Sequence, residues 1–197
     1  MNEKTFSSVS SLPPGYEKTF SINIRQDKRI SLILNGVSIA LLVLAGWFLL
    51  EFVPTPSVME GKITLLHLAI FLLSLIIMII LHEGIHALFF WLFSKKPVKF
   101  GFLSSGLAFY AACPGQYFSR SAYMVIALSP LLIICALAFI GMSVLPPGLL
   151  FALMCIFVLN FAGASGDLYY AFRIILAPKH SYALDTEDGM QIFSPAN

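Results

Sequence analysis

The sequence predicts an all-α integral membrane protein with four transmembrane helices and a small β-hairpin or sheet on the cytoplasmic side. The first observation is composition: 58% of the 197 residues are hydrophobic and only 11% are charged, whereas soluble domains carry about 25% charged residues. The second is the presence of four apolar runs long enough to cross a bilayer, which takes about 20 residues. The formal net charge of +2 is too small to indicate a nucleic-acid partner, so the expected partner is the lipid bilayer.

The four apolar runs lie at about residues 30–53, 63–93, 121–145 and 148–177, and together they form a predicted membrane core of residues 30–177. The second run would make a helix of about 46 Å, longer than a hydrocarbon core of about 30 Å, so it must tilt, kink or project from the membrane. Pro146 and Pro147 form a short connection between the last two runs, because proline ends one helix and is tolerated in the first turn of the next.

Basic residues near the ends of the runs predict the orientation, since Lys and Arg accumulate in cytoplasmic loops. They cluster before the first run, after the second and at the C-terminal end of the fourth, at Lys18, Arg25, Lys28, Arg29, Lys95, Lys96, Lys99, Arg120, Arg173 and Lys179. The other two connections contain only Lys62. We therefore expect the N-terminal tail, residues 1–29, and the C-terminal tail, residues 178–197, on the cytoplasmic side of a cell membrane.

Outside the runs, several segments have a predicted local structure. Residues 97–115 alternate in hydrophobicity on both sides of Ser104-Ser105-Gly106, which is typical of a β-hairpin, with an ordinary apolar loop as the alternative. Residues 19–24 alternate in the same way and form a candidate strand. The polar, acidic tail from Ser181 is expected to be loosely ordered. The three cysteines are expected to be free thiols.

A polar cluster lies inside the second run, where Ile79 to Phe93 reads IILHEGIHALFFWLF. His82 and His86 are four residues apart and share one face of a helix. With Glu83 they match the H-E-x-x-H pattern, in which two histidines bind zinc and the glutamate acts as a base. Ionisable residues within a membrane helix are costly and commonly functional. The alternative is a hydrogen-bonded polar cluster that joins helices.

A catalytic zinc site usually has three protein ligands and one open position for water, so a third ligand must come from another segment. His67 lies about 22 Å from the histidine pair along the same helix and is excluded. Glu51 and Glu60 belong to the opposite membrane face, whereas Asp167 lies within the fourth run at the same depth as the histidines. We therefore expect an oxygen of Asp167 within about 5 Å of both histidine rings, with His180 as the next candidate.

Small residues precede Asp167 in the sequence NFAGASGD, residues 160–167. The residues from Gly163 to Gly166 form a smooth patch, which lets membrane helices approach each other closely. Asn160 lies two turns before Asp167 on the same helix face. Two roles are open for it: a hydrogen bond between helices, or an amide that contacts the substrate or stabilises an oxyanion.

With HEGIH in the second run and NFAGASGD in the fourth, the chain resembles the site-2 protease-like intramembrane zinc metalloproteases. More closely, it resembles the small bacterial membrane proteins of the "putative zincin peptidase" family. ALSP, residues 127–130, stands where that core has a short motif in the intervening helix. The chain departs from the site-2 pattern in that Gly166 precedes Asp167 instead of following it, and in that no PDZ-like insertion is present. The resemblance implies a minimal core whose activity is proteolysis.

These residues together predict a zinc-dependent endopeptidase embedded in the membrane. His82, His86 and Asp167 would hold Zn²⁺, and Glu83 would pass the proton of the attacking water to the leaving amine. The expected substrate is a membrane protein or peptide, captured along an edge of the 97–115 hairpin; its identity and the oligomeric state stay open. The alternatives are a membrane transporter for metal ions and a non-catalytic metal-binding membrane protein, neither of which needs Glu83.

Overall fold

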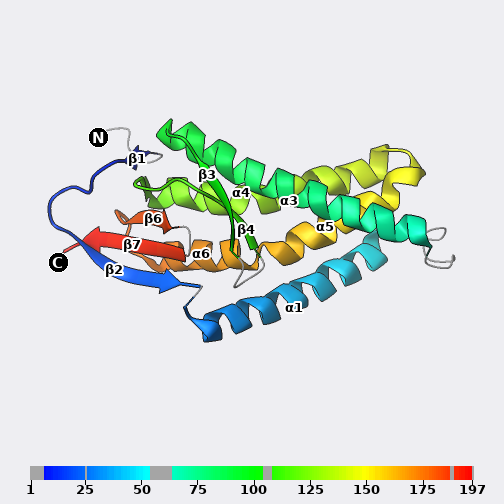
Figure 1. Cartoon of the computed structure of the whole chain (residues 1–197), viewed down its shortest axis with the longest axis horizontal. Coiled ribbons are helices and arrows are strands. Elements are labelled where there is room, and N and C mark those ends of the chain that lie inside the picture. Colours follow the sequence, from blue (N-terminus) through cyan, green and yellow to red (C-terminus); the bar gives the residue numbers. More distant parts are fainter. Residues whose placement is uncertain (1–6, 25, 54–63, 104–107, 187–188, 197) are drawn as a thin grey trace. The chain divides into compact units, whose positions relative to one another are not determined.

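The computed structural model describes residues 7–24, 26–53, 64–103, 108–186 and 189–196 (Figure 1). Within these residues the helices are α1 Lys28–Phe52, α3 Leu65–Ser94, α4 Arg120–Val144, the 3-10 helix η1 Pro147–Leu149, α5 Leu150–Gly163 and α6 Ser165–Leu176. The strands are β1 Ser8–Val9, β2 Tyr16–Asn23, β3 Lys99–Leu103, β4 Ala108–Ala112, β5 Tyr117–Ser119, β6 Tyr182–Thr186 and β7 Gly189–Pro195.

The chain divides into two compact units, and each takes segments from distant parts of the sequence. The first unit is made of Met1–Ile33, Glu83–Ser129 and Gly166–Asn197, and the second of Leu34–His82 and Pro130–Ser165. All the described strands belong to the first unit. The three cysteines are free thiols, as predicted.

Helices α1, α3 and α4 are each long and apolar enough to cross a membrane. Their large apolar side chains are widely exposed on the protein surface, for example Leu65 at 82% and Val144 at 72%. A helix that is apolar all round needs an apolar environment, in a protein core or in a bilayer. The short connection after α4 is confirmed, because α4 ends at Val144 and η1 begins at Pro147.

The predicted fourth transmembrane helix, residues 148–177, is corrected to a broken helix. α5 ends at Gly163, α6 begins at Ser165, and the two are bent by 43° at the break. The pair makes a fourth span only if a broken helix counts as one. Glycine has a low helix propensity, and Ala164 is the C-cap of α5, whose N–H makes the last helical hydrogen bond, to the carbonyl of Asn160. The small residues around Ala164 therefore account for the break.

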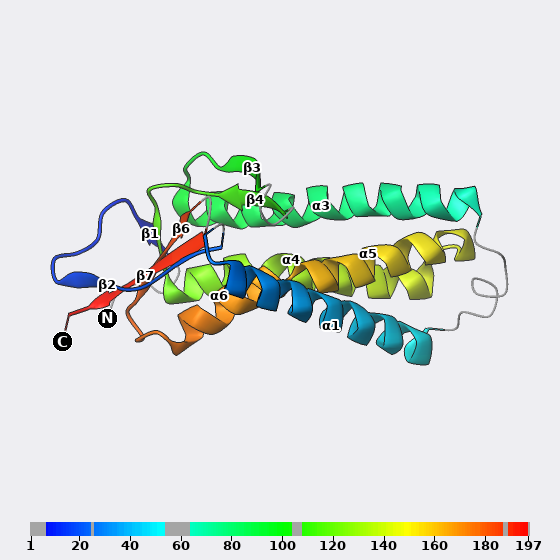
Figure 2. The same ribbon diagram turned by 60° about the horizontal axis from the view of Figure 1, so that its bottom comes forward.

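Aliphatic and aromatic residues form the core of the second unit, in which Figure 2 shows α4 and α5 running side by side. Leu49 of α1, Ala138 of α4 and Phe157 of α5 are all buried in this core. The hydroxyl of Ser38 donates a hydrogen bond of 2.7 Å to the carbonyl oxygen of Ala162. This bond connects α1 to the last turn of α5.

In the first unit, five strands form one antiparallel sheet in the order β1-β5-β6-β7-β2, of which Figure 1 shows β6, β7 and β2 side by side. β6 and β7 both follow Ser181, so the prediction of a loosely ordered C-terminal tail is wrong. Ala183, Met190 and Ile192 of these strands are buried in the core. The acidic composition of the tail hid this alternation of buried and exposed side chains, which is typical of a half-buried strand.

The other two strand predictions are confirmed. β2 covers most of the predicted strand at residues 19–24 and pairs with β7. β3 and β4 form the predicted hairpin as a separate two-stranded sheet, in which Phe102 lies opposite Phe109. Phe100, Phe102 and Phe109 are each more than half exposed and give the hairpin an apolar surface. The predicted turn at Ser104-Ser105-Gly106 lies outside the described residues.

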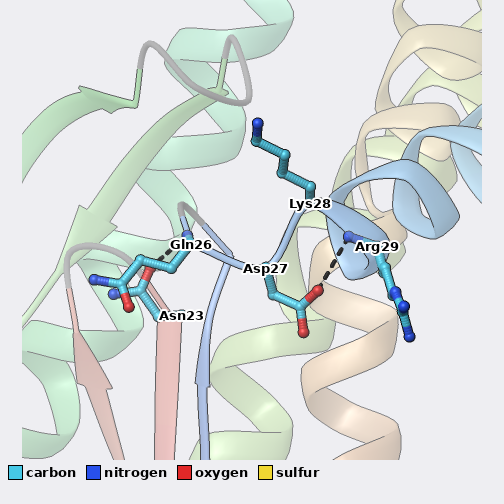
Figure 3. Close-up of a pocket in the computed structure, with 5 residues that line it drawn as sticks. All are labelled: Asn23, Gln26, Asp27, Lys28 and Arg29. Carbon is cyan, nitrogen blue, oxygen red and sulfur yellow. Dashed lines mark hydrogen bonds between the residues drawn. The ribbon is translucent and has the colours of Figure 1, made fainter.

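The start of α1 is defined by a side-chain cap. The carboxylate of Asp27 accepts hydrogen bonds from the backbone N–H groups of Arg29 at 3.0 Å and Ile30 at 3.2 Å; Figure 3 shows the first of these. Such an N-cap satisfies N–H groups that have no helical partner in the first turn. A surface pocket next to this cap is lined by polar residues: Asn23, Gln26, Asp27, Lys28 and Arg29.

Candidate metal centre

Two histidines on α3 are buried, although many of the apolar side chains on this helix are exposed. His82 and His86 are 8% and 7% exposed, and they lie one helical turn apart, so both side chains leave the same face of α3. Glu83, next to His82, is half-buried. Burying an imidazole ring without partners is unfavourable. The atoms around the two rings therefore define the chemistry of the site.

His86 has a partner at each ring nitrogen. Its Nδ1 atom lies 3.0 Å from the carbonyl oxygen of Ile126 on α4, and its Nε2 atom lies 3.3 Å from Oδ1 of Asp167 in the first turn of α6. A carbonyl oxygen can only accept a hydrogen bond, so in the neutral ring Nδ1 carries the proton and Nε2 presents its lone pair. Metal-binding histidines are commonly oriented in this way by a backbone carbonyl.

His82 is oriented in the same way by Asn160 of α5. Its Nδ1 atom lies 2.9 Å from Oδ1 of Asn160. The Nδ2 group of Asn160 donates to the carbonyl oxygens of Pro130 and Leu131, both at 3.4 Å. Because those carbonyls only accept, the amide oxygen must face the imidazole ring, and Nδ1 of His82 then carries the proton. The ring consequently presents the lone pair of Nε2.

Asn160 therefore makes the hydrogen bond between helices, which is one of the two roles that the sequence left open. Its side chain is fully buried, and both ends of its carboxamide have partners. Contact between Asn160 and a substrate stays a prediction.

The structure brings the three predicted ligands together. One ligand atom from each of His82, His86 and Asp167 lies within 4.8 Å of the other two, as expected from the sequence. Two imidazole nitrogens and a carboxylate oxygen suit zinc, which takes nitrogen and oxygen ligands at about 2.0 to 2.2 Å. Two atoms at such distances from a tetrahedral ion lie roughly 3.3 to 3.6 Å apart, in agreement with the 3.3 Å between His86 and Asp167. The residues therefore fit a zinc ion.

The other candidates considered from the sequence have different surroundings. Nδ1 of His67 lies 2.7 Å from the hydroxyl of Thr64, and His180 is exposed. Neither belongs to the group of candidate ligands found among the described residues. Arg173, on the same helix as Asp167, places its guanidinium over the ring of Phe20, 3.8 Å from the centroid.

A third acidic side chain near the centre, after Glu83 and Asp167, was not predicted from the sequence. Asp185 of β6 is buried, and its Oδ1 accepts a hydrogen bond of 3.2 Å from the hydroxyl of Tyr123 on α4. Burial raises the pKa of Asp185 to about 8; Asp167 and Glu83 act in the same direction, against His86 and the Tyr123 hydrogen bond. Sequence alternation does not single out this residue, because the larger apolar side chains of β6, Tyr182 and Leu184, lie on the opposite face of the strand.

Comparison with known proteins identifies the family of the chain. Residues 75–182 match the model of the family described as "putative zincin peptidase". The match covers more than half of the 197-residue chain, and the chain therefore belongs to this family. It includes the HEGIH motif and Asp167, whereas Asp185 lies beyond it. No curated protein and no solved structure gives a significant match.

Proposed function

We propose that the protein is a zinc-dependent endopeptidase embedded in a membrane, which hydrolyses a peptide bond in a membrane protein or peptide. The observation that carries this proposal is the approach of His82, His86 and Asp167 to within 4.8 Å of one another, with Glu83 adjacent to the first of them. Membership of the zincin family supports the same chemistry. A structural site alone would need the three ligands but would have no use for the intervening glutamate.

In this proposal each residue of the motif has a separate task. His82 and His86 would hold zinc through Nε2, because Nδ1 of each ring is held by Asn160 or by the carbonyl of Ile126. Asp167 would supply the third ligand and the negative charge. Zinc in such a site lowers the pKa of water to about 7 and polarises a carbonyl group. Glu83 then accepts a proton from the attacking water and delivers it to the leaving amine.

The proposed surroundings are a bilayer crossed by α1, α3, α4 and the broken pair α5–α6. Basic residues flank the ends of these helices that carry both termini and the β3–β4 hairpin, which favours a cytoplasmic location for them. The exposed aromatic face of the hairpin, Phe100, Phe102 and Phe109, suits a position at the membrane surface. We also propose that the protein acts like a site-2 protease. An unwound segment of the substrate would then pair as an added strand with an edge of the hairpin.

The experiment that tests this function compares wild type with Glu83→Gln, using Glu51→Gln as a matched control because Glu51 lies on the exposed surface of α1. Zinc content is measured on the purified full-length protein, and cleavage is followed with fluorescent casein and with single-span membrane reporters. We expect Glu83→Gln to retain zinc and lose cleavage, because the carboxylate transfers protons without binding the ion. Glu51→Gln should keep both.

His82→Ala and His86→Ala should lose zinc and cleavage together, since each removes a ligand. Full activity of Glu83→Gln on a substrate that wild type cleaves would disprove the proposed mechanism. A wild-type protein that binds no zinc would disprove the metal centre itself.

A further inference from the structure

α4 contains a proline four residues after the carbonyl group that orients His86. Pro130 lies inside α4 and is fully buried. In an α-helix the carbonyl oxygen of residue 126 accepts a hydrogen bond from the N–H group of residue 130. Proline has no N–H group, so the carbonyl oxygen of Ile126 lacks its usual helical donor.

Two side chains donate to this oxygen instead. Nδ1 of His86 lies 3.0 Å from it, and the hydroxyl of Ser129 donates to it at 3.1 Å. His86, Ile126 and Ser129 are all buried. A buried carbonyl without a donor is unfavourable, and so is a buried imidazole N–H without an acceptor. The Ile126 carbonyl and the His86 ring therefore satisfy each other.

We propose that Pro130 is a positioning residue of the metal centre. Because it supplies no backbone N–H, it leaves the Ile126 oxygen to the Nδ1–H of His86 and thereby directs Nε2 of that ring toward Asp167. This gives the ALSP motif of α4 a physical role. The inference rests on the proposed zinc site, but it does not depend on peptide hydrolysis.

Any other residue at position 130 would restore a backbone N–H that competes with His86 for the same oxygen. When its acceptor is lost, the imidazole ring can rotate or change tautomer, and the lone pair of Nε2 is then no longer held in place. Loss of such an orienting contact typically lowers metal affinity by roughly 10- to 100-fold. The helix itself should not suffer, because removing a proline from a helix interior generally stabilises the helix.

Pro130→Ala and Pro130→Val test this inference as a pair. Both restore the N–H group, but valine keeps a side-chain volume close to that of proline and alanine does not. The Zn²⁺ affinity of the purified full-length protein is measured by competition with a chromophoric chelator. The tautomer of His86 is measured in zinc-free protein by nitrogen-15 NMR of the imidazole rings, and thermal unfolding reports whether each variant is folded.

We expect both variants to lose roughly 10- to 100-fold in Zn²⁺ affinity, with no decrease in melting temperature and with altered nitrogen shifts of the His86 ring. Ser129→Ala is the control, because it removes the other side-chain donor to Ile126 and restores no N–H. It should leave the Zn²⁺ affinity and the His86 tautomer close to those of wild type.

A loss of affinity in Pro130→Ala but not in Pro130→Val would assign the effect to packing and overturn the inference. Unchanged affinity and unchanged His86 shifts in both variants would overturn it as well. If wild type binds no Zn²⁺, the proposed metal centre fails. The nitrogen shifts of the zinc-free variants would then still support or overturn the link between Pro130 and His86.

Discussion

The carboxamide oxygen of Asn160 lies 2.9 Å from Nδ1 of His82, across 78 positions of the sequence. This contact predicts that Asn160→Ala lowers Zn²⁺ affinity by roughly 10- to 100-fold, because the His82 ring loses the acceptor that orients it. Asn160→Asp keeps an acceptor oxygen and should lose less. Chelator competition on folded protein measures both variants, and an Asn160→Ala affinity equal to that of wild type would contradict the prediction.

Asp167→Asn should abolish most of the zinc binding while the protein remains folded. The amide keeps the shape of the carboxylate but loses its negative charge, which a cation close to His86 requires. We expect a fall in Zn²⁺ affinity of roughly 100-fold or more, beyond the effect of an orienting residue. Metal analysis measures the affinity, and circular dichroism of the same sample confirms the helical fold. Tight zinc binding by this variant would remove Asp167 from the set of ligands.

Asp185 predicts a pH dependence of stability. The folded protein retains the proton of Asp185 up to a pKa of about 8, whereas an unfolded chain releases it near pH 4. The folded state therefore binds more protons between these values, and this residue makes the protein less stable as the pH rises from about 4 to about 8. Asp185→Asn keeps an acceptor for Tyr123 and removes the titration.

Chemical unfolding in the presence of a chelator should thus show Asp185→Asn gaining stability over wild type as the pH increases across that range. Glu17→Gln, at an exposed position of β2, is the control and should follow wild type. Parallel curves for wild type and Asp185→Asn would show that burial does not hold the proton on Asp185.

Reporter fusions should place both termini and the β3–β4 hairpin on the cytoplasmic side. The basic residues near these segments favour this side because positively charged loops are retained there. Fusions after Lys96 and after Ala196 should therefore report the cytoplasm, and fusions after Thr64 and after Leu145 the outside. An outside location for the fusion after Lys96 would reject the four-span arrangement and with it the equal depth of Asp167 and the histidines.

Much of the helical framework and three members of the candidate site were predictable from the sequence. Long apolar runs identify helices because the preference of a residue for helix or for an apolar environment depends mainly on its near neighbours in the sequence. A spacing of four residues places His82 and His86 on one face of any helix. Asp167 could be selected from the sequence because it lies at the same depth as the histidines. A carboxylate within an apolar run also needs a cation or another polar partner. The break at Ala164 was not predicted, since the small residues there are also compatible with close helix packing.

The sequence by itself therefore identified which side chains would come together as candidate ligands, and the tertiary structure decided what surrounds them. The acceptor for His86 is a backbone carbonyl 40 positions away, and any residue type carries such a carbonyl, so composition cannot identify it. Tyr123 and Asp185 are 62 positions apart in the sequence. Their hydrogen bond forms only because β6 and α4 pack into the same core. Such contacts depend on how distant segments pack, whereas sequence periodicity reports only the few residues on either side of a position.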